Sequence, residues 1–139
     1  MKMPLKPKYN QRTDLDKATK HHTLNYIPKI IPELNFVFCQ AMLNQRHDER
    51  LWNNNLIKIF PNINKSKTVQ KNRESLHNDL DDIRRLRNRI AHHEPIFEEK
   101  ILSLYNKTIK IIDTRCQETG NWVKTHQTVT TLISQKPKI

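Results

Sequence analysis

The fold is decided by the sequence VQKNRESLHNDLDDIRRLRNRIAHHEP, which covers residues 69–95. Its apolar side chains recur three, four or seven positions apart, the spacing that places them along one side of an α-helix. They are Val69, Leu76, Leu80, Ile83, Leu86 and Ile90. Proline disfavours helical backbone in the residue before it, so Pro95 predicts that the helix ends near His93 or Glu94. The stretch therefore predicts one long helix with a cluster of cations in its last turns.

Two apolar stripes of similar period precede this helix. The first begins at Pro32, a residue suited to the first turn of a helix, and runs to about Gln45. The second lies over residues 51–60 and is ended by Pro61, after which residues 62–67 are expected to form a polar loop. We therefore expect two core helices ahead of the long one.

Another stripe follows the long helix, over residues 101–116. This helix is expected to pack antiparallel to the long one, and Gly120 is expected as a cap beyond its end. Apolar residues between 122 and 133 indicate a short terminal helix. The expected architecture is a bundle of four core helices plus a short C-terminal helix.

Composition favours an all-α fold in a single domain. The chain has 139 residues, and its one glycine against seven prolines leaves few positions for hairpins or phosphate-binding loops. Residues 1–25 are basic and poor in apolar side chains. They predict a flexible arm in front of a helical domain at residues 26–139.

Charge and cysteine content indicate the partner and the compartment. The formal net charge of +11 and the pI of about 9.9 predict attraction to a polyanion, and nucleic acid is the expected one. Cys39 and Cys116 lie near apolar residues, and the first residues lack an apolar secretory run. The most apolar window, residues 26–43, is interrupted by prolines and charges, so no membrane span is expected. A cytoplasmic location is expected.

The last turns of the long helix combine two kinds of chemistry. Guanidinium groups bind phosphate oxygens through paired hydrogen bonds, and imidazole titrates near neutral pH. On an ideal helix Asn88 and His92 share a face, whereas Arg87 is rotated away from His92 by about 140°. Fraying near Pro95 or a second copy of the chain would bring the guanidinium and imidazole together.

The segment Arg87-Asn88-Arg89-Ile90-Ala91-His92 resembles the arginine, short spacer and histidine motif of HEPN ribonucleases. Residues 83–97 around it resemble the Abi-like (AbiD/AbiF) bacterial abortive-infection group. The same order of motifs includes Glu49-Arg50-Leu51-Trp52 and Ile59-Phe60-Pro61 ahead of it. The resemblance implies a HEPN-like helical bundle that forms a homodimer, with the motifs of both copies converging in one cleft.

The resemblance also implies an activity, metal-independent cleavage of RNA in phage defence or in a toxin–antitoxin system. A cognate antitoxin RNA or protein would then be a further partner. His92 is expected to transfer protons at the ribose 2′-hydroxyl or the leaving 5′-oxygen, and Arg87 to stabilise charge on the phosphate. Asn88 is expected to orient His92 or the phosphate through its amide. The flanking cations expected to guide RNA are Arg84, Arg85, Arg89 and His93.

Neither a metal nor another cofactor is expected. The histidines lack HExxH spacing, and no clustered thiolates accompany them. In HEPN toxins that a partner nucleotidyltransferase silences, a tyrosine lies two residues after the motif histidine. That position is Glu94 here, so modification of that kind is not expected.

Three other interpretations are open at the level of sequence. A non-catalytic RNA-binding module would need only the charge. His92 could simply cap the helix end while Arg87 pairs with a nearby carboxylate and the outer arginines form a solvated face. A protein-interaction partner, such as an antitoxin, would use the apolar face around Trp122.

Overall fold

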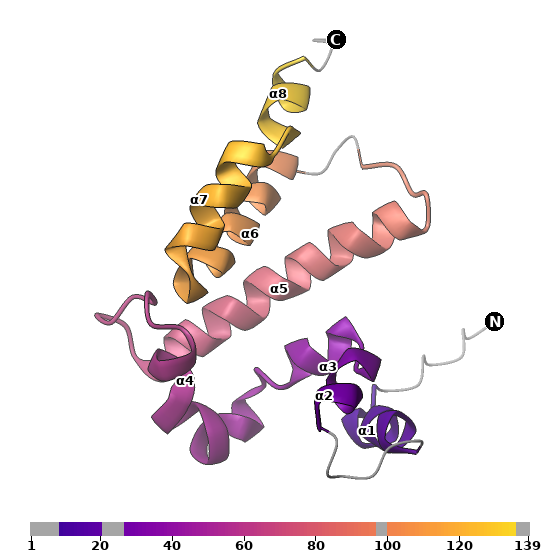
Figure 1. Ribbon diagram of the computed structural model, residues 1–139, viewed down its shortest axis with the longest axis vertical. Helices are drawn as coiled ribbons and strands as arrows, with labels where there is room; N and C mark the ends of the chain where they lie inside the picture. Colours follow the sequence, from indigo (N-terminus) through magenta and orange to yellow (C-terminus); the bar gives the residue numbers. More distant parts are fainter. Residues whose placement is uncertain (1–8, 21–26, 97–99, 136–139) are drawn as a thin grey trace, which may run out of the picture. The chain divides into compact units, whose positions relative to one another are not determined.

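The computed structural model describes residues 9–20, 27–96 and 100–135. Within these ranges the chain consists of helices and turns and contains no strand (Figure 1), which confirms the predicted all-α class. The chain divides into two compact units, Met1–Met42 and Leu43–Ile139. The predicted boundary between residues 25 and 26 lies outside the described residues.

The first unit is built from short helices. They are α1 Gln11–Thr19, α2 Ile27–Ile30, the 3₁₀ turn η1 Ile31–Glu33 and α3 Phe36–Ala41. Asn10 caps α1, because its side-chain oxygen accepts a hydrogen bond from the Arg12 N–H at 2.9 Å. Asn35 links α3 to α1 by donating from Nδ2 to Asp14 Oδ2 at 2.6 Å.

This unit differs from two expectations. Residues 11–19 form a capped helix where the sequence predicted a flexible arm, and residues 1–8 and 21–25 of that arm lie outside the described residues. The prediction of a single helix from Pro32 to Gln45 is wrong, because the helical backbone is interrupted at Asn35. The Asn35 side chain accepts from the Phe38 N–H at 2.8 Å and so begins a new helix there.

The second unit contains the long helix, α5 Val69–Ala91, between α4 Asn53–Ile59 and α6 Ile101–Arg115. The other elements are the 3₁₀ turn η2 Gln45–His47, the π-helical turn η3 Asp48–Trp52, α7 Gln117–His126 and α8 Val129–Ser134. Thr68 caps α5, because its Oγ1 accepts from the Lys71 N–H at 3.3 Å. The helices predicted over residues 51–60, from residue 69 to 93 or 94, and over residues 101–116 are confirmed, and α5 ends at Ala91, slightly earlier than expected.

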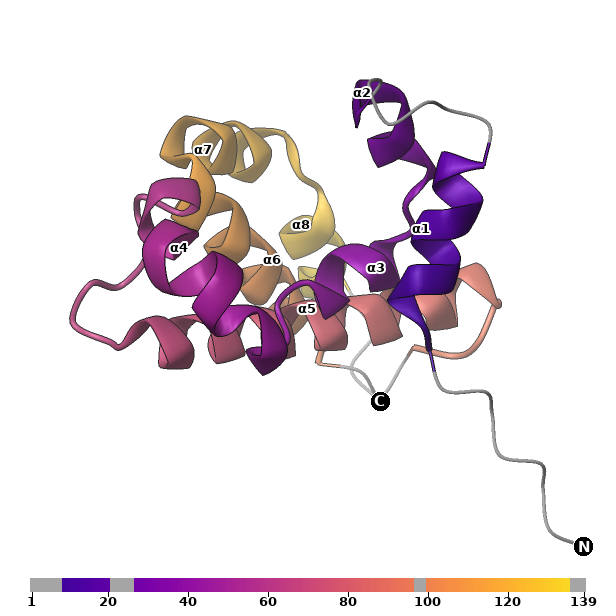
Figure 2. The ribbon, with the colours of Figure 1, turned by 90° about the horizontal axis from the view of Figure 1, so that it is seen from below.

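The helices α5 and α6 run antiparallel, as predicted. Lys110 of α6 lies 2.7 Å from Asp79, and Lys107, one turn earlier on α6, binds Asp82, one turn later on α5. Figures 1 and 2 show α6 between α5 and α7, while α4 packs against α5. This arrangement leaves the last turns of α5 away from α4 and α7.

The core of the second unit lies along the first half of α5. Its buried apolar side chains include Trp52, Leu56, Leu76 and Ile109. A buried ion pair ties η3 to α5: Arg73 Nε lies 2.6 Å from Asp48 Oδ1, and Arg73 Nη1 donates to the Leu43 carbonyl oxygen at 2.7 Å. The first half of α5 is therefore anchored, whereas Ile90 near its other end is 53% exposed.

Gly120 is not the cap that the sequence predicted. The helix α6 ends at Arg115, Cys116 takes an extended backbone, and Gly120 lies inside α7. A Cβ atom at Gly120 would come within 1.7 Å of Asp113 Oδ1. Glycine is used here because α7 packs closely on α6. The terminal segment forms two helices, α7 and α8, where one short helix was expected.

Candidate nucleic-acid interface

The end of α5 is closed by a pair of backbone hydrogen bonds. The Glu94 N–H donates to the Arg89 carbonyl at 2.8 Å, and the His93 N–H donates to the Ile90 carbonyl at 3.1 Å. This is the Schellman pattern, in which the residue after the cap takes a left-handed backbone, and His93 does so with φ of 55°. The helix is therefore intact to Ala91, and of the two routes to a combined site the structure does not show the fraying of the helix end.

His92 occupies the cap position of this helix end. Its backbone N–H donates to the Asn88 carbonyl at 2.9 Å, and its side chain is exposed. Within the part of the chain that the structure describes, the imidazole makes neither a hydrogen bond nor an ion pair. The capping role is thus played by the backbone of His92, which leaves both ring nitrogens available to a ligand.

Arg87 lies one turn earlier and is also exposed. Its Nη1 donates to Asn88 Oδ1 at 3.2 Å, so the guanidinium and the amide of two predicted site residues are in contact. Among the described residues Arg87 has no carboxylate partner. The alternative in which Arg87 forms an ion pair is therefore not the arrangement observed.

The flanking arginines are held by carboxylates. Arg84 and Arg85 both bind Asp81, with closest distances of 2.7 and 2.8 Å, although the Arg85 side chain is still 71% exposed. Arg89 Nε lies 3.7 Å from Glu94 Oε2, and its Nη2 donates to the Pro95 carbonyl. Exposed ion pairs are weak, so these arginines can still turn to a polyanion.

The structure brings Arg87 to Asn88 but not to His92. On a regular helix the two side chains point about 140° apart, and α5 is regular to its end. The exposed His93 extends from the turn beyond them. One copy of the chain therefore presents a guanidinium and an imidazole on different sides of the same helix end.

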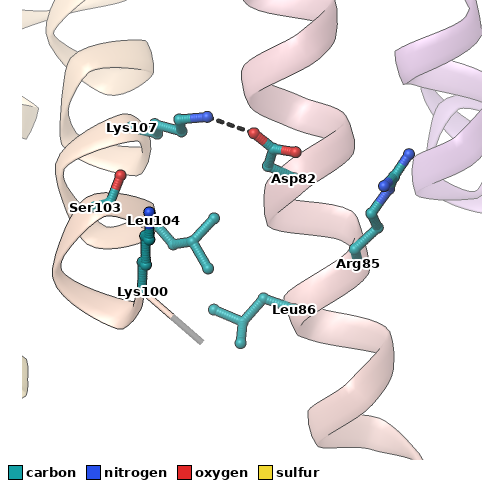
Figure 3. A pocket seen from close by; sticks show the side chains of 7 residues that line it. All are labelled: Asp82, Arg85, Leu86, Lys100, Ser103, Leu104 and Lys107. Atoms are coloured by element: carbon teal, nitrogen blue, oxygen red, sulfur yellow. Dashed lines mark hydrogen bonds and ion pairs between the residues drawn. The ribbon is translucent and has the colours of Figure 1, made fainter. Parts of the chain in front are cut away.

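Sequence reasoning missed a cavity that adjoins this helix end. A space of about 430 Å³ lies between α5 and α6 (Figure 3) and is lined by Asp82, Arg85, Leu86, Lys100, Ser103, Leu104 and Lys107. Lys100, Ser103 and Lys107 are three and four positions apart on α6 and so share a face. That polar stripe was visible in the sequence, but which helix it faces was not.

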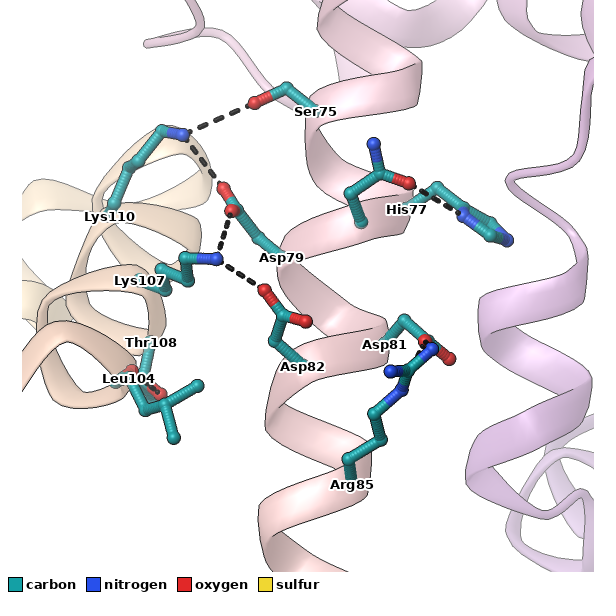
Figure 4. Close-up of polar contacts among 11 residues, drawn as sticks. Ser75, His77, Asp79, Asp81, Asp82, Arg85, Leu104, Lys107, Thr108 and Lys110 are labelled. Carbon is teal, nitrogen blue, oxygen red and sulfur yellow. Dashed lines mark hydrogen bonds and ion pairs between the residues drawn. The ribbon is translucent and has the colours of Figure 1, made fainter. Parts of the chain in front are cut away.

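A network of acids and lysines fixes the side of the cavity nearest the core. Lys107 Nζ binds Asp82 and lies 3.6 Å from Asp79, which also holds Lys110 (Figure 4). The hydrogen bond to Asp82 is the main cause that raises the pKa of Lys107 above its ordinary value. Lys107 therefore keeps its positive charge at neutral pH.

The described residues offer neither a membrane-spanning helix nor a metal-binding cluster. None of the described helices combines the length and the apolar character needed to cross a bilayer. Among the same residues, no three side chains of histidine, cysteine, aspartate or glutamate gather closely enough to hold a metal ion. The features that distinguish this surface are thus its cations and its exposed imidazoles.

The fold and this surface define an all-helical, strongly basic protein whose longest helix ends in exposed cations. Comparisons with protein-family models, with curated proteins and with solved structures found no match.

Proposed function

We propose that this protein is a metal-independent endoribonuclease of a bacterial phage-defence (abortive infection) or toxin–antitoxin system. It would act in the cytoplasm as a HEPN-like homodimer on cellular or phage RNA. The observation that supports this proposal most is the state of Arg87 and His92. Both are exposed at the end of α5 and lack carboxylate partners within the described chain, whereas the neighbouring arginines are paired.

The chemistry needs a base, an acid and a cation. The imidazole of one His92 removes the proton from the ribose 2′-hydroxyl, whose oxygen then attacks the adjacent phosphorus. A second His92 gives a proton to the leaving 5′-oxygen, so the products are a cyclic phosphate and a free 5′-hydroxyl. Arg87 stabilises the charge that develops on the phosphate oxygens, and Asn88, in contact with Arg87, orients its guanidinium.

Two copies are required because one helix cannot supply this constellation. The side chains of Arg87 and His92 diverge, and a second imidazole is needed as the acid. A twofold axis beside the end of α5 would place a guanidinium of one copy near an imidazole of the other. Ile90, which lies between these residues in the sequence and is 53% exposed, supplies apolar surface for such a contact.

The proposal is tested by incubating the purified protein with mixed RNA in EDTA. Wild type is expected to cut RNA, and Arg87→Ala and His92→Ala are each expected to lower the rate by about a hundredfold or more. Matched controls are Arg50→Ala on η3 and His77→Ala on α5, which remove the same side chains elsewhere. Cleavage that is equal in the variants and in wild type, or absent from wild type, contradicts the proposal.

The second candidate is a non-catalytic module that holds a small regulatory or structured RNA. The separation of Arg87 and His92 on a single copy favours it, since binding by charge needs no contact between them. For such a module, His92→Ala would leave affinity almost unchanged. Removal of Arg84, Arg85 and Arg89 together would weaken binding and reduce its dependence on salt.

A further inference from the structure

The cavity between α5 and α6 has the chemistry of a phosphate site. Lys100 and Lys107 bring two ammonium groups and Ser103 a hydroxyl, and Asp82 is the one carboxylate among the described residues that line it. Figure 3 shows these side chains around Leu86 and Leu104, which face each other between the helices. Lysine binds phosphate as a point charge, and hydroxyl groups donate to phosphate oxygens.

Lys100 and Lys107 differ in how their ammonium groups are held. Lys100 is exposed at the N-cap of α6, and within the described residues it has neither a hydrogen-bond nor an ion-pair partner. Lys107 is held in place by Asp82 and Asp79. Among the residues that the structure describes, the cavity therefore combines a fixed ammonium group with one that no carboxylate holds.

The position of the cavity relates it to the proposed cleavage site. Leu86, which lines it, directly precedes Arg87, and Arg85 at its edge lies two helical turns before His92 on the same face. The guanidinium of Arg85 points away from α6 toward Asp81 (Figures 3 and 4). On α5, the lining of the cavity therefore ends one residue before Arg87.

We propose that this cavity binds a phosphate of the RNA backbone beside the nucleotide that is cut. Its volume of about 430 Å³ is ample for a phosphate with part of its ribose. The lysines contact only the backbone, so the subsite positions the strand and carries no base specificity. This inference rests on the proposed function for the identity of the ligand.

The test measures binding separately from cleavage. The probe is a fluorescein-labelled single-stranded oligonucleotide with 2′-O-methyl riboses, in which the nucleophile of the proposed reaction is blocked. Lys100→Ala is expected to weaken its binding by about threefold to tenfold and to lower the salt slope by about 0.7. The matched control is Lys71→Ala, which removes an exposed lysine near the other end of α5.

A second variant is expected to change the affinity in the opposite direction. Asp82→Asn removes the cavity's carboxylate and is expected to tighten binding, a result that loss of folding could not imitate. A deoxyribose version of the probe is expected to show the same change for Lys100→Ala, because only phosphates are contacted. Equal effects of Lys100→Ala and Lys71→Ala, or weaker binding by Asp82→Asn, would overturn the subsite.

The proposed function is tested by a different measurement, the cleavage of unmodified RNA. If wild type leaves unmodified RNA intact while Lys100→Ala still weakens binding, the nuclease is wrong and the phosphate subsite is supported. If wild type cuts RNA while Lys100→Ala and Lys71→Ala bind alike, the subsite is wrong and the nuclease is supported.

Discussion

A single strained residue closes the helix that carries the candidate site. His93 has a φ of 55°, a region that costs a non-glycine residue about 1 kcal/mol. In return, the turn satisfies two carbonyl groups at the end of α5 and projects His92 and His93 into solvent. Glycine would be less strained than histidine at this position, so the presence of a histidine here supports a functional role for the turn.

We therefore predict that His93→Gly stabilises the fold and weakens RNA binding. Removal of the Cβ atom should raise the free energy of unfolding by about 0.5–1 kcal/mol, measured by urea titration. The matched control is His92→Gly, whose φ of −97° suits any residue, and which should be destabilising. An unchanged or lower stability of His93→Gly would show that the turn is not strained.

The spacing of acidic residues in the sequence indicates which arginines of α5 form ion pairs. Arg84 and Arg85 stand three and four positions after Asp81, the spacing of helical ion pairs, and both pairs form. Arg87 has no acid at either spacing, so its lack of a carboxylate partner was predictable. The left-handed backbone of His93 was not, because most histidines have a negative φ even though the residue is enriched among non-glycine residues with a positive one.

At the scale of the elements, the close packing of α7 on α6 depends on Gly120. The position of this residue inside a helix lowers helix propensity by about 1 kcal/mol relative to alanine. The absence of a side chain leaves room for Asp113, which pairs with Lys124 at 2.8 Å. Packing thus outweighs propensity at this position.

Gly120→Ala is accordingly expected to destabilise the protein despite the better helix former. The new methyl group displaces the Asp113 side chain, and overpacking of this kind should lower the free energy of unfolding by about 1–2 kcal/mol. The double variant with Asp113→Ala should recover most of that loss, as a urea titration would show. Asn121→Ala, at an exposed position of α7, serves as control. A stabilising Gly120→Ala would refute this account of the contact.

The helices that could be predicted are those whose bounds depend on residues within or next to the helix itself. The end of α5 follows from Pro95, and its apolar period spans the whole helix. The break at Asn35 was missed because the apolar spacing on either side continues through it, while the competing cap is a single side-chain contact. The role of Gly120 and the cavity beside Lys100 depend on which helices meet, and periodicity within one helix does not contain that information.

In the whole molecule, the proposed cleavage site requires two copies of the chain. One copy of the second unit holds its core along the first half of α5 and leaves the other end exposed. The guanidinium of Arg87 and the imidazole of His92 are available there but point in different directions. The central claim is therefore that a working site combines groups from both copies.

Dilution of wild type with an inactive variant provides the direct test. Wild type is mixed with a ninefold excess of His92→Ala, allowed to exchange subunits and assayed on RNA in EDTA beside wild type alone. About nine in ten wild-type chains then pair with a variant chain, and such a mixed dimer holds one His92 where the reaction needs both a base and an acid. We predict that the activity per wild-type chain falls to about a tenth. An activity per wild-type chain that His92→Ala leaves unchanged, when wild type cuts RNA and subunit exchange is shown by mass, would contradict a site shared between two copies.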